Sequence, residues 1–207
     1  MARQSRFWDR LAQRYSKQPI SDLPSYEKKL EVTQSYLRPD MQMLELGCGT
    51  GSTAVLHAPH VKNIHAVDIS QKMIEIAREN AIKARVSNVK FYVAPIKDFV
   101  APEGGYDVVM AMSVLHLVED RDALIGRVYD MLKPGGLFIS STICMGDTMK
   151  FFKLIAPVGQ AIGLLPLLRV FSQDELRDSL KAVGFTIEHD WCPGTGKALF
   201  LVARKQA

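Results

Sequence analysis

The residues with the clearest chemical meaning are three alternating glycines, Gly47, Gly49 and Gly51, which follow the apolar run 41–46. The apolar run predicts a buried strand, and the glycines predict a tight turn at its end. Glycine allows a positive φ and lets a ligand approach the backbone with no Cβ in the way. An ordinary strand-to-helix turn is the alternative, but it does not need three alternating glycines. After the first strand of an α/β sheet, such a turn is where nucleotide-like ligands bind.

Two acidic residues narrow the class of ligand. Asp68 ends a second strand-like run, 63–68, and a carboxylate there can accept hydrogen bonds from both hydroxyls of a ribose. Glu45 precedes the glycines, where an acid would repel a pyrophosphate but suits an ammonium and a sulfonium. A dinucleotide fingerprint also needs Gly or Ala where Ser52 stands. The purely structural alternatives are a solvated strand-end acid for Glu45 and a helix-start acid for Asp68. We favour binding of S-adenosyl-L-methionine.

Four motifs together resemble those of the class I S-adenosylmethionine-dependent methyltransferases. They are Leu44–Gly51, Ala66–Ser70, Tyr106–Val109 and Leu132–Gly136. The resemblance covers roughly residues 41–203. It implies a seven-stranded, Rossmann-like methyltransferase sheet whose last strand is antiparallel, and methyl transfer to a nucleophile.

The resemblance also implies further cofactor contacts. Family members often carry Gly-Asp-Ala after the third strand, whereas this chain has Ala94-Pro95-Ile96 and no side-chain acceptor for the adenine amino group. We expect Ile69 and Ile96 to sandwich the adenine, with the backbone N–H of Ile96 meeting the ring. Tyr15 matches a tyrosine position that many members use over the methionyl end of the cofactor.

The segment after strand 106–112 bears on the reaction. By the resemblance, Ala111 and Met112 match positions whose backbone touches the methionyl part of the cofactor. The Asn/Asp-Pro-Pro-aromatic tetrad and the Pro-Cys pair of nucleic-acid methyltransferases are absent, which argues against a base as acceptor. His116 is the candidate general base because an ordinary histidine pKa lies near neutrality. A packed histidine without a catalytic role is the favoured alternative.

Alternating strand and helix signals predict an α/β fold with a doubly wound, mostly parallel sheet. Strands are expected at 41–46, 63–68, 89–93, 106–112, 137–142, 185–191 and 197–203, and helices at 5–17, 24–37, 51–57, 70–84, 120–132 and 172–183. The last two strands predict a C-terminal antiparallel hairpin around Gly194-Thr195-Gly196. Ser172 and Glu175 predict a capping box, and Pro134-Gly135-Gly136 is expected to end helix 120–132.

Composition predicts one globular methyltransferase domain over residues 1–207. The net charge of +4 is too small to indicate a nucleic-acid partner. Cys48, Cys144 and Cys192 lack metal-binding spacing, and no metal is expected. We find no signal peptide or membrane-spanning run, so a cytoplasmic protein is expected.

Residues 1–40 are expected to form a helical lid within this domain. Helix 5–17 has a basic face and an apolar stripe. The basic residues are Arg3, Arg6, Arg10, Arg14 and Lys17, and the apolar ones are Phe7, Leu11 and Tyr15. We favour a lid packed by the apolar stripe; contact with an anionic membrane surface is the alternative.

Residues 146–170 are expected to form a substrate-cap insertion, because family members often insert their cap at this place. Met149, Phe152 and Ile155 are the candidate substrate-binding residues, and their apolar character predicts an apolar or aromatic acceptor. A pair of core helices is the alternative. The sequence thus favours a methyltransferase of a small molecule. A protein or rRNA methyltransferase and a non-catalytic cofactor-binding protein stay open, as do the acceptor atom and the oligomeric state.

Overall fold

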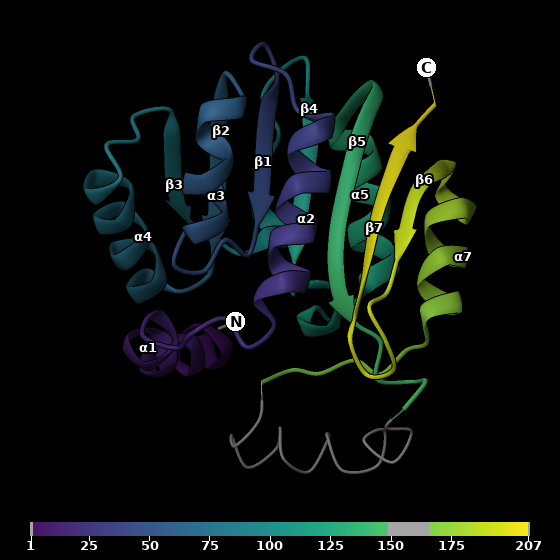
Figure 1. The fold of residues 1–207 in the computed structure, drawn as a ribbon, viewed down its shortest axis with the longest axis horizontal. Helices are drawn as coiled ribbons and strands as arrows, with labels where there is room; N and C mark the ends of the chain where they lie inside the picture. Colours follow the sequence, from purple (N-terminus) through teal and green to yellow (C-terminus); the bar gives the residue numbers. More distant parts are fainter. Residues whose placement is uncertain (1, 149–165, 207) are drawn as a thin grey trace. The chain divides into compact units, whose positions relative to one another are not determined.

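The computed structural model describes residues 2–148 and 166–206. The chain divides into two compact units, Met1–Pro102 and Glu103–Ala207. The helices and strands of both units are labelled in Figure 1.

The first unit contains three parallel strands, which alternate with helices. Its strands are β1 (Gln42–Leu46), β2 (Asn63–Asp68) and β3 (Val89–Val93), and its helices are α1 (Ala2–Ser16), α2 (Leu23–Tyr36), α3 (Ser52–His57) and α4 (Gln71–Lys83). β2 pairs with both β1 and β3. Residues 43–46 of β1 are all buried. An unbroken buried run is typical of a parallel strand covered on both faces.

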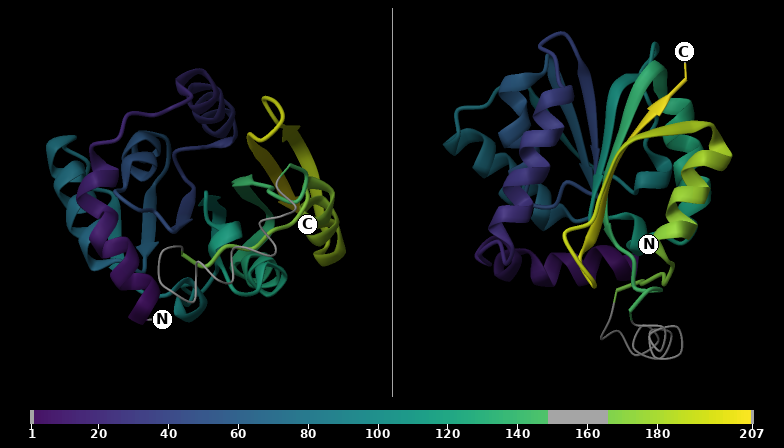
Figure 2. Two further views of the ribbon diagram at one scale, coloured as in Figure 1. Left: turned by 90° about the horizontal axis from the view of Figure 1, so that it is seen from below. Right: turned by 45° about the vertical axis from the view of Figure 1, so that its right-hand side comes forward.

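Helix α1 packs across the start of α4 (Figures 1 and 2). Ala12 is completely buried in a cluster with Met73 and Ile76 of α4, and Trp8 packs against this cluster. Of the predicted apolar stripe, Phe7 and Leu11 are half-buried, as Trp8 is, and Tyr15 is half exposed. The helix expected at 5–17 is therefore present, but Trp8 and Ala12 make its contact with α4.

Among its described residues, the second unit has four strands and two α-helices. They are β4 (Tyr106–Met112), β5 (Leu132–Ile143), β6 (Phe185–Trp191), β7 (Ala198–Lys205), α5 (Arg121–Met131) and α7 (Gln173–Val183). β4 and β5 are parallel, whereas β7 runs antiparallel to both β5 and β6. This confirms the C-terminal hairpin. Ser172 and Glu175 form the expected capping box at the start of α7.

The strands of the described residues pair in the order β3-β2-β1-β4-β5-β7-β6. The predicted α/β fold with a mostly parallel seven-stranded sheet is confirmed. The predicted start of β5 was wrong by five residues, since the strand begins at Leu132 rather than at residue 137. Leu132 pairs with Tyr106 and Leu137 pairs with Val108, so residues 133–136 form an irregularity. Gly135 permits this irregularity with a φ of +74°. Pro134-Gly135-Gly136, which was expected to end helix 120–132, therefore lies inside β5.

The two ends of the predicted cap segment 146–170 meet. The N–H of Gly146 donates to the carbonyl oxygen of Phe171 at 2.8 Å. A Cβ at Gly146 would lie 2.6 Å from the carbonyl carbon of Phe171, so only glycine fits this contact. Residues 149–165, with the candidates Met149, Phe152 and Ile155, lie outside the described residues. In the parts of the chain that the structure describes, no helix has the length and apolar character to cross a membrane.

Candidate functional site

The glycine turn after β1 is built from three left-handed residues with different surroundings. Gly47, Gly49 and Gly51 have φ values of +66°, +52° and +71°. A Cβ at Gly51 would lie 2.8 Å from the Cβ of Ala77 in α4, so Gly51 allows close packing of the turn against that helix. A Cβ at Gly49 would have the ring of Tyr15 as its nearest neighbour, at 4.0 Å. Gly49 therefore combines a conformation that favours glycine with an accessible backbone.

Asp68, at the end of β2, holds this turn. Its Oδ2 accepts from the N–H of Gly49 at 2.9 Å, and its Oδ1 accepts from the N–H of Ser70 at 2.8 Å. Burial raises the pKa of Asp68, while the hydrogen bonds from Ser70, Gly49 and Ile69 act in the opposite direction. Three N–H donors occupy three of about four lone-pair positions, so the carboxylate keeps acceptor capacity for a ligand hydroxyl. Besides the expected ribose contact, Asp68 therefore stabilises the conformation of the glycine turn.

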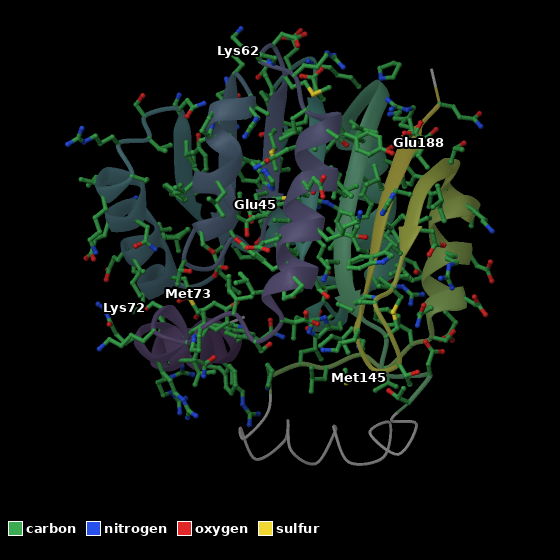
Figure 3. The ribbon with its side chains drawn as sticks, in the orientation of Figure 1. Glu45, Lys62, Lys72, Met73, Met145 and Glu188 are labelled. Carbon is green, nitrogen blue, oxygen red and sulfur yellow. The ribbon has the colours of Figure 1, made fainter. Side chains whose placement is uncertain are left out.

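Glu45 lies one residue before the end of β1 (Figure 3). Only 2% of the residue is exposed. Its Oε2 has no hydrogen-bond partner among the described residues. Burial, together with the nearby charge of Asp68, raises the pKa of Glu45 to about 8. A buried, unpartnered carboxyl oxygen is costly to leave unsatisfied, and a ligand ammonium would satisfy it. This observation fits the S-adenosylmethionine expected from the sequence.

Two tyrosines lie close to the same acids. Burial raises the pKa of Tyr15, and the charges of Asp68 and Glu45 raise it further. Tyr26 of α2 forms a side-chain hydrogen bond with Thr53, and burial and the charge of Glu45 raise its pKa. Tyr15 was predicted here, whereas Tyr26 and Thr53 were missed. No motif or spacing in the sequence marks them, because α2 reaches the turn only through the tertiary fold.

The predicted adenine contacts belong to the same unit. Ile69 follows Asp68 directly and is half-buried, as is Ile96 in a short 3-10 helix, Ile96–Asp98. The N–H of Ala94 donates to the carbonyl oxygen of Asp68 at 3.0 Å. This bond brings the loop after β3 to the end of β2, next to Ile69. The contacts of Ile69 and Ile96 with adenine stay predictions.

The second unit carries the other candidates. Ala111 is buried and Met112 is half-buried at the end of β4, and their methionyl contacts stay predictions. Ser113 follows with a φ of +59°, and its N–H donates to the carbonyl oxygen of Ser141 at 2.7 Å. A positive φ at a non-glycine residue is uncommon and clusters at functional sites. The sequence pattern contained no signal for Ser113.

His116 lies in a short 3-10 helix, Leu115–Leu117. Its Nδ1 has no partner among the residues that the structure describes. Burial lowers the pKa of His116 to about 4, so the expectation of a pKa near neutrality was wrong. Its carbonyl oxygen accepts from the N–H of Arg169 at 2.8 Å. A role as general base stays a prediction, for which the low pKa predicts a weak base.

Comparison with known proteins identifies the family of the chain. The methyltransferase-domain family matches residues 37–184, which is more than half of the chain. A ubiquinone biosynthesis O-methyltransferase of Shewanella is 34% identical over 126 residues, which cover 61% of this chain and 53% of that protein. A carboxy-S-adenosyl-L-methionine synthase of Hydrogenovibrio crunogenus is 33% identical over 128 residues, with coverages of 58% and 51%. The chain thus spans about half the length of these curated relatives.

Solved structures extend the likeness to the whole fold. The N-methyltransferase NodS of Bradyrhizobium japonicum, in complex with S-adenosyl-L-homocysteine, aligns with a TM-score of 0.72 at 19% identity. The alignment covers 90% of this chain and 88% of NodS. At this identity the likeness shows the fold, while the family match shows the membership. The chain belongs to the class I S-adenosylmethionine-dependent methyltransferase family, as the four sequence motifs had implied.

Proposed function

We propose that this protein transfers the methyl group of S-adenosylmethionine to a small apolar or aromatic acceptor, and that Glu45, Asp68 and the glycine turn hold the cofactor. The buried Oε2 of Glu45, which has no partner among the described residues, carries the cofactor part of this proposal. In the bound state Glu45 would accept from the ammonium, and Asp68 would accept from the ribose hydroxyls. Tyr15, which lies against Gly49, would cover the methionyl end.

When bound, the cofactor supplies a methyl carbon that is already activated. The protein therefore has to orient the acceptor and exclude water, and these two effects supply most of the rate enhancement in such a transfer. A base is needed only for an acceptor that must lose a proton. Burial of His116 keeps that imidazole neutral at neutral pH, so its basic nitrogen is free of a proton, although its low pKa weakens it as a base.

Two observations support a small apolar acceptor. The segment 146–170 is rich in large apolar side chains, and the motifs of nucleic-acid methyltransferases are absent. One relative is named as an enzyme of ubiquinone biosynthesis. A cytoplasmic location and a single domain over residues 1–207 stay part of this proposal, and cell fractionation tests the location.

Methyl-labelled S-adenosylmethionine tests the proposal. The purified protein is incubated with separated metabolite, protein and RNA fractions, with Asp68→Ala as the matched variant. We expect label in an organic-extractable small molecule. Asp68→Ala should weaken binding of S-adenosylhomocysteine by about 1.5–3 kcal/mol, since hydrogen bonds to a charged acceptor are lost. Label confined to protein or RNA would refute the small acceptor. Unchanged binding by Asp68→Ala, or saturable binding of NAD, would refute the cofactor site.

A further inference from the structure

An acid of α1, Asp9, is hydrogen-bonded to the start of α4. Asp9 Oδ1 accepts from the Oγ of Ser70 at 2.6 Å and from the backbone N–H of Lys72 at 3.1 Å. Asp9 is the one acidic residue in the sequence of α1, which otherwise carries several arginines. The first N–H groups of a helix lack intrahelical partners and favour a negative charge. Asp9 therefore occupies a place where an acid is bound well.

An apolar contact lies beside this polar one. Trp8 and Ala12 of α1 pack with Met73 and Ile76 of α4. Figure 3 shows Lys72 and Met73 at the end of α4 that faces α1. The apolar contact holds α1 against α4, whereas the two hydrogen bonds of Asp9 have directional requirements. Directional bonds of this kind restrict the rotation and register of a helix more than an apolar contact does.

Ser70 connects this attachment to the glycine turn. Its hydroxyl donates to Asp9 and accepts from the N–H of Met73, while its own N–H donates to Asp68 Oδ1. Asp68 Oδ2 in turn accepts from the N–H of Gly49. A continuous series of hydrogen bonds therefore runs from α1 through the start of α4 to the turn.

The same helix carries Tyr15 to the turn. Tyr15 lies six residues after Asp9, about 9 Å along a helix. Its ring is the nearest neighbour of the Cβ position of Gly49, at 4.0 Å, although half of the residue is exposed. Since Tyr15 is carried by α1, a rotation of this helix would move the ring relative to the turn.

We propose that Asp9 is a positioning residue of the cofactor site, which holds α1 in the rotation that places Tyr15 over Gly49. Asp9 contacts neither the turn nor, in this proposal, the cofactor; it acts through Tyr15. The inference rests on the proposed function, in which Tyr15 and the glycine turn bind S-adenosylmethionine.

A double-mutant cycle tests the inference. Asp9→Ala, Tyr15→Ala and the double variant are compared with the wild type, and Gln13→Ala, at an exposed position of α1, is the matched control. Calorimetry measures the Kd of S-adenosylhomocysteine, and hydrogen exchange measures the protection of α1. We expect Asp9→Ala to raise the Kd about tenfold, through loss of charge-assisted hydrogen bonds, and to speed exchange in α1. The double variant should bind no more weakly than Tyr15→Ala.

Asp9→Asn separates the hydrogen bonds from the charge. Both bonds end on one oxygen, so the amide oxygen of asparagine can accept both, and the Kd should stay within about threefold of the wild type. Trp8→Ala removes part of the apolar contact between α1 and α4 and should also raise the Kd. This variant tests the attachment of α1 if Asp9→Ala folds poorly. Thermal melting checks the fold of each variant.

Several results would overturn the inference. A wild-type Kd for both Asp9→Ala and Trp8→Ala would show that the attachment of α1 does not affect the cofactor site. Effects of Asp9→Ala and Tyr15→Ala that multiply would show that Asp9 does not act through Tyr15. Wild-type binding by Tyr15→Ala would refute the inference and the Tyr15 contact together. The Asp68→Ala experiment would still decide the rest of the cofactor site.

Discussion

Glu45 should lose a proton when the cofactor binds. In the structure its carboxyl is buried, its Oε2 has no partner among the described residues, and burial raises its pKa to about 8. At pH 7 this carboxyl is therefore mostly protonated. A ligand ammonium beside it stabilises the ionised form and lowers the pKa. Binding at neutral pH is thus coupled to release of the proton.

The size of the effect follows from the pKa. With a pKa of about 8, Glu45 is roughly nine-tenths protonated at pH 7, and each pH unit below the pKa adds about 1.4 kcal/mol to the cost of ionising it. The Kd should therefore fall about tenfold between pH 6 and pH 7, with close to one proton released per ligand. The ammonium of a free amino acid is less acidic than a peptide α-amino group, whose pKa is about 7.7–8.0, so it stays charged in this interval.

Calorimetry in two buffers of different ionisation enthalpy measures the released protons directly. S-adenosylhomocysteine is titrated at pH 6 and pH 7 into the wild type and into Glu45→Gln. The glutamine variant keeps the shape of the side chain but does not titrate, so its Kd should be nearly independent of pH. Asp68→Asn is a second variant, which should bind more weakly and also show a smaller pH dependence, because removal of the Asp68 charge lowers the pKa of Glu45.

Two outcomes would refute the reasoning. If the wild type releases no proton and its Kd is equal at pH 6 and pH 7, Glu45 is already ionised without the ligand or does not meet the ammonium. If Glu45→Gln keeps the wild-type dependence on pH, another group is responsible.

Two further predictions concern stability. Gly51→Ala should lower the free energy of unfolding by about 2–4 kcal/mol, since a Cβ there would lie 2.8 Å from that of Ala77 at a φ of +71°. The control is Gly104→Ala, which has a φ of +86° but open space around the Cβ position and should cost only about 1–2 kcal/mol. Urea denaturation measures both, and equal losses would contradict the packing argument. Burial lowers the pKa of His57 to about 4, so the unfolded chain binds the proton first and stability should fall by about 2 kcal/mol between pH 7 and pH 5. In His57→Gln this part of the pH dependence should vanish, and a wild-type slope in the variant would exclude His57 as its source.

Much of the fold could be predicted because its signals are local. Mainly apolar runs such as 41–46 mark buried parallel strands, and Ser172 with Glu175 marks a helix start through bonds between near neighbours. The start of β5 was missed because its first pairs depend on β4. Lys133, near the start of β5, forms an ion pair with Asp107 of β4 at 2.8 Å. In the sequence, the proline and two glycines that follow Lys133 conceal this part of the strand.

The sequence by itself determined the family and the chemical character of the proposed cofactor site. Alternating glycines after a strand, with Glu45 before them and Asp68 at the next strand end, specify a backbone conformation and the acceptors that it needs. These requirements are properties of residue type and of short spacing, so they can be read without coordinates.

Only the tertiary structure decided how these residues are held and charged. Asp9 and Ser70 are 61 positions apart, and nothing in either segment predicts that one accepts a hydrogen bond from the other. The pKa values of Glu45 and His116 depend on burial, which shifts the two in opposite directions because it disfavours the charged form of each. Desolvation results from the packing of distant segments around a group, and for that reason local sequence does not encode it.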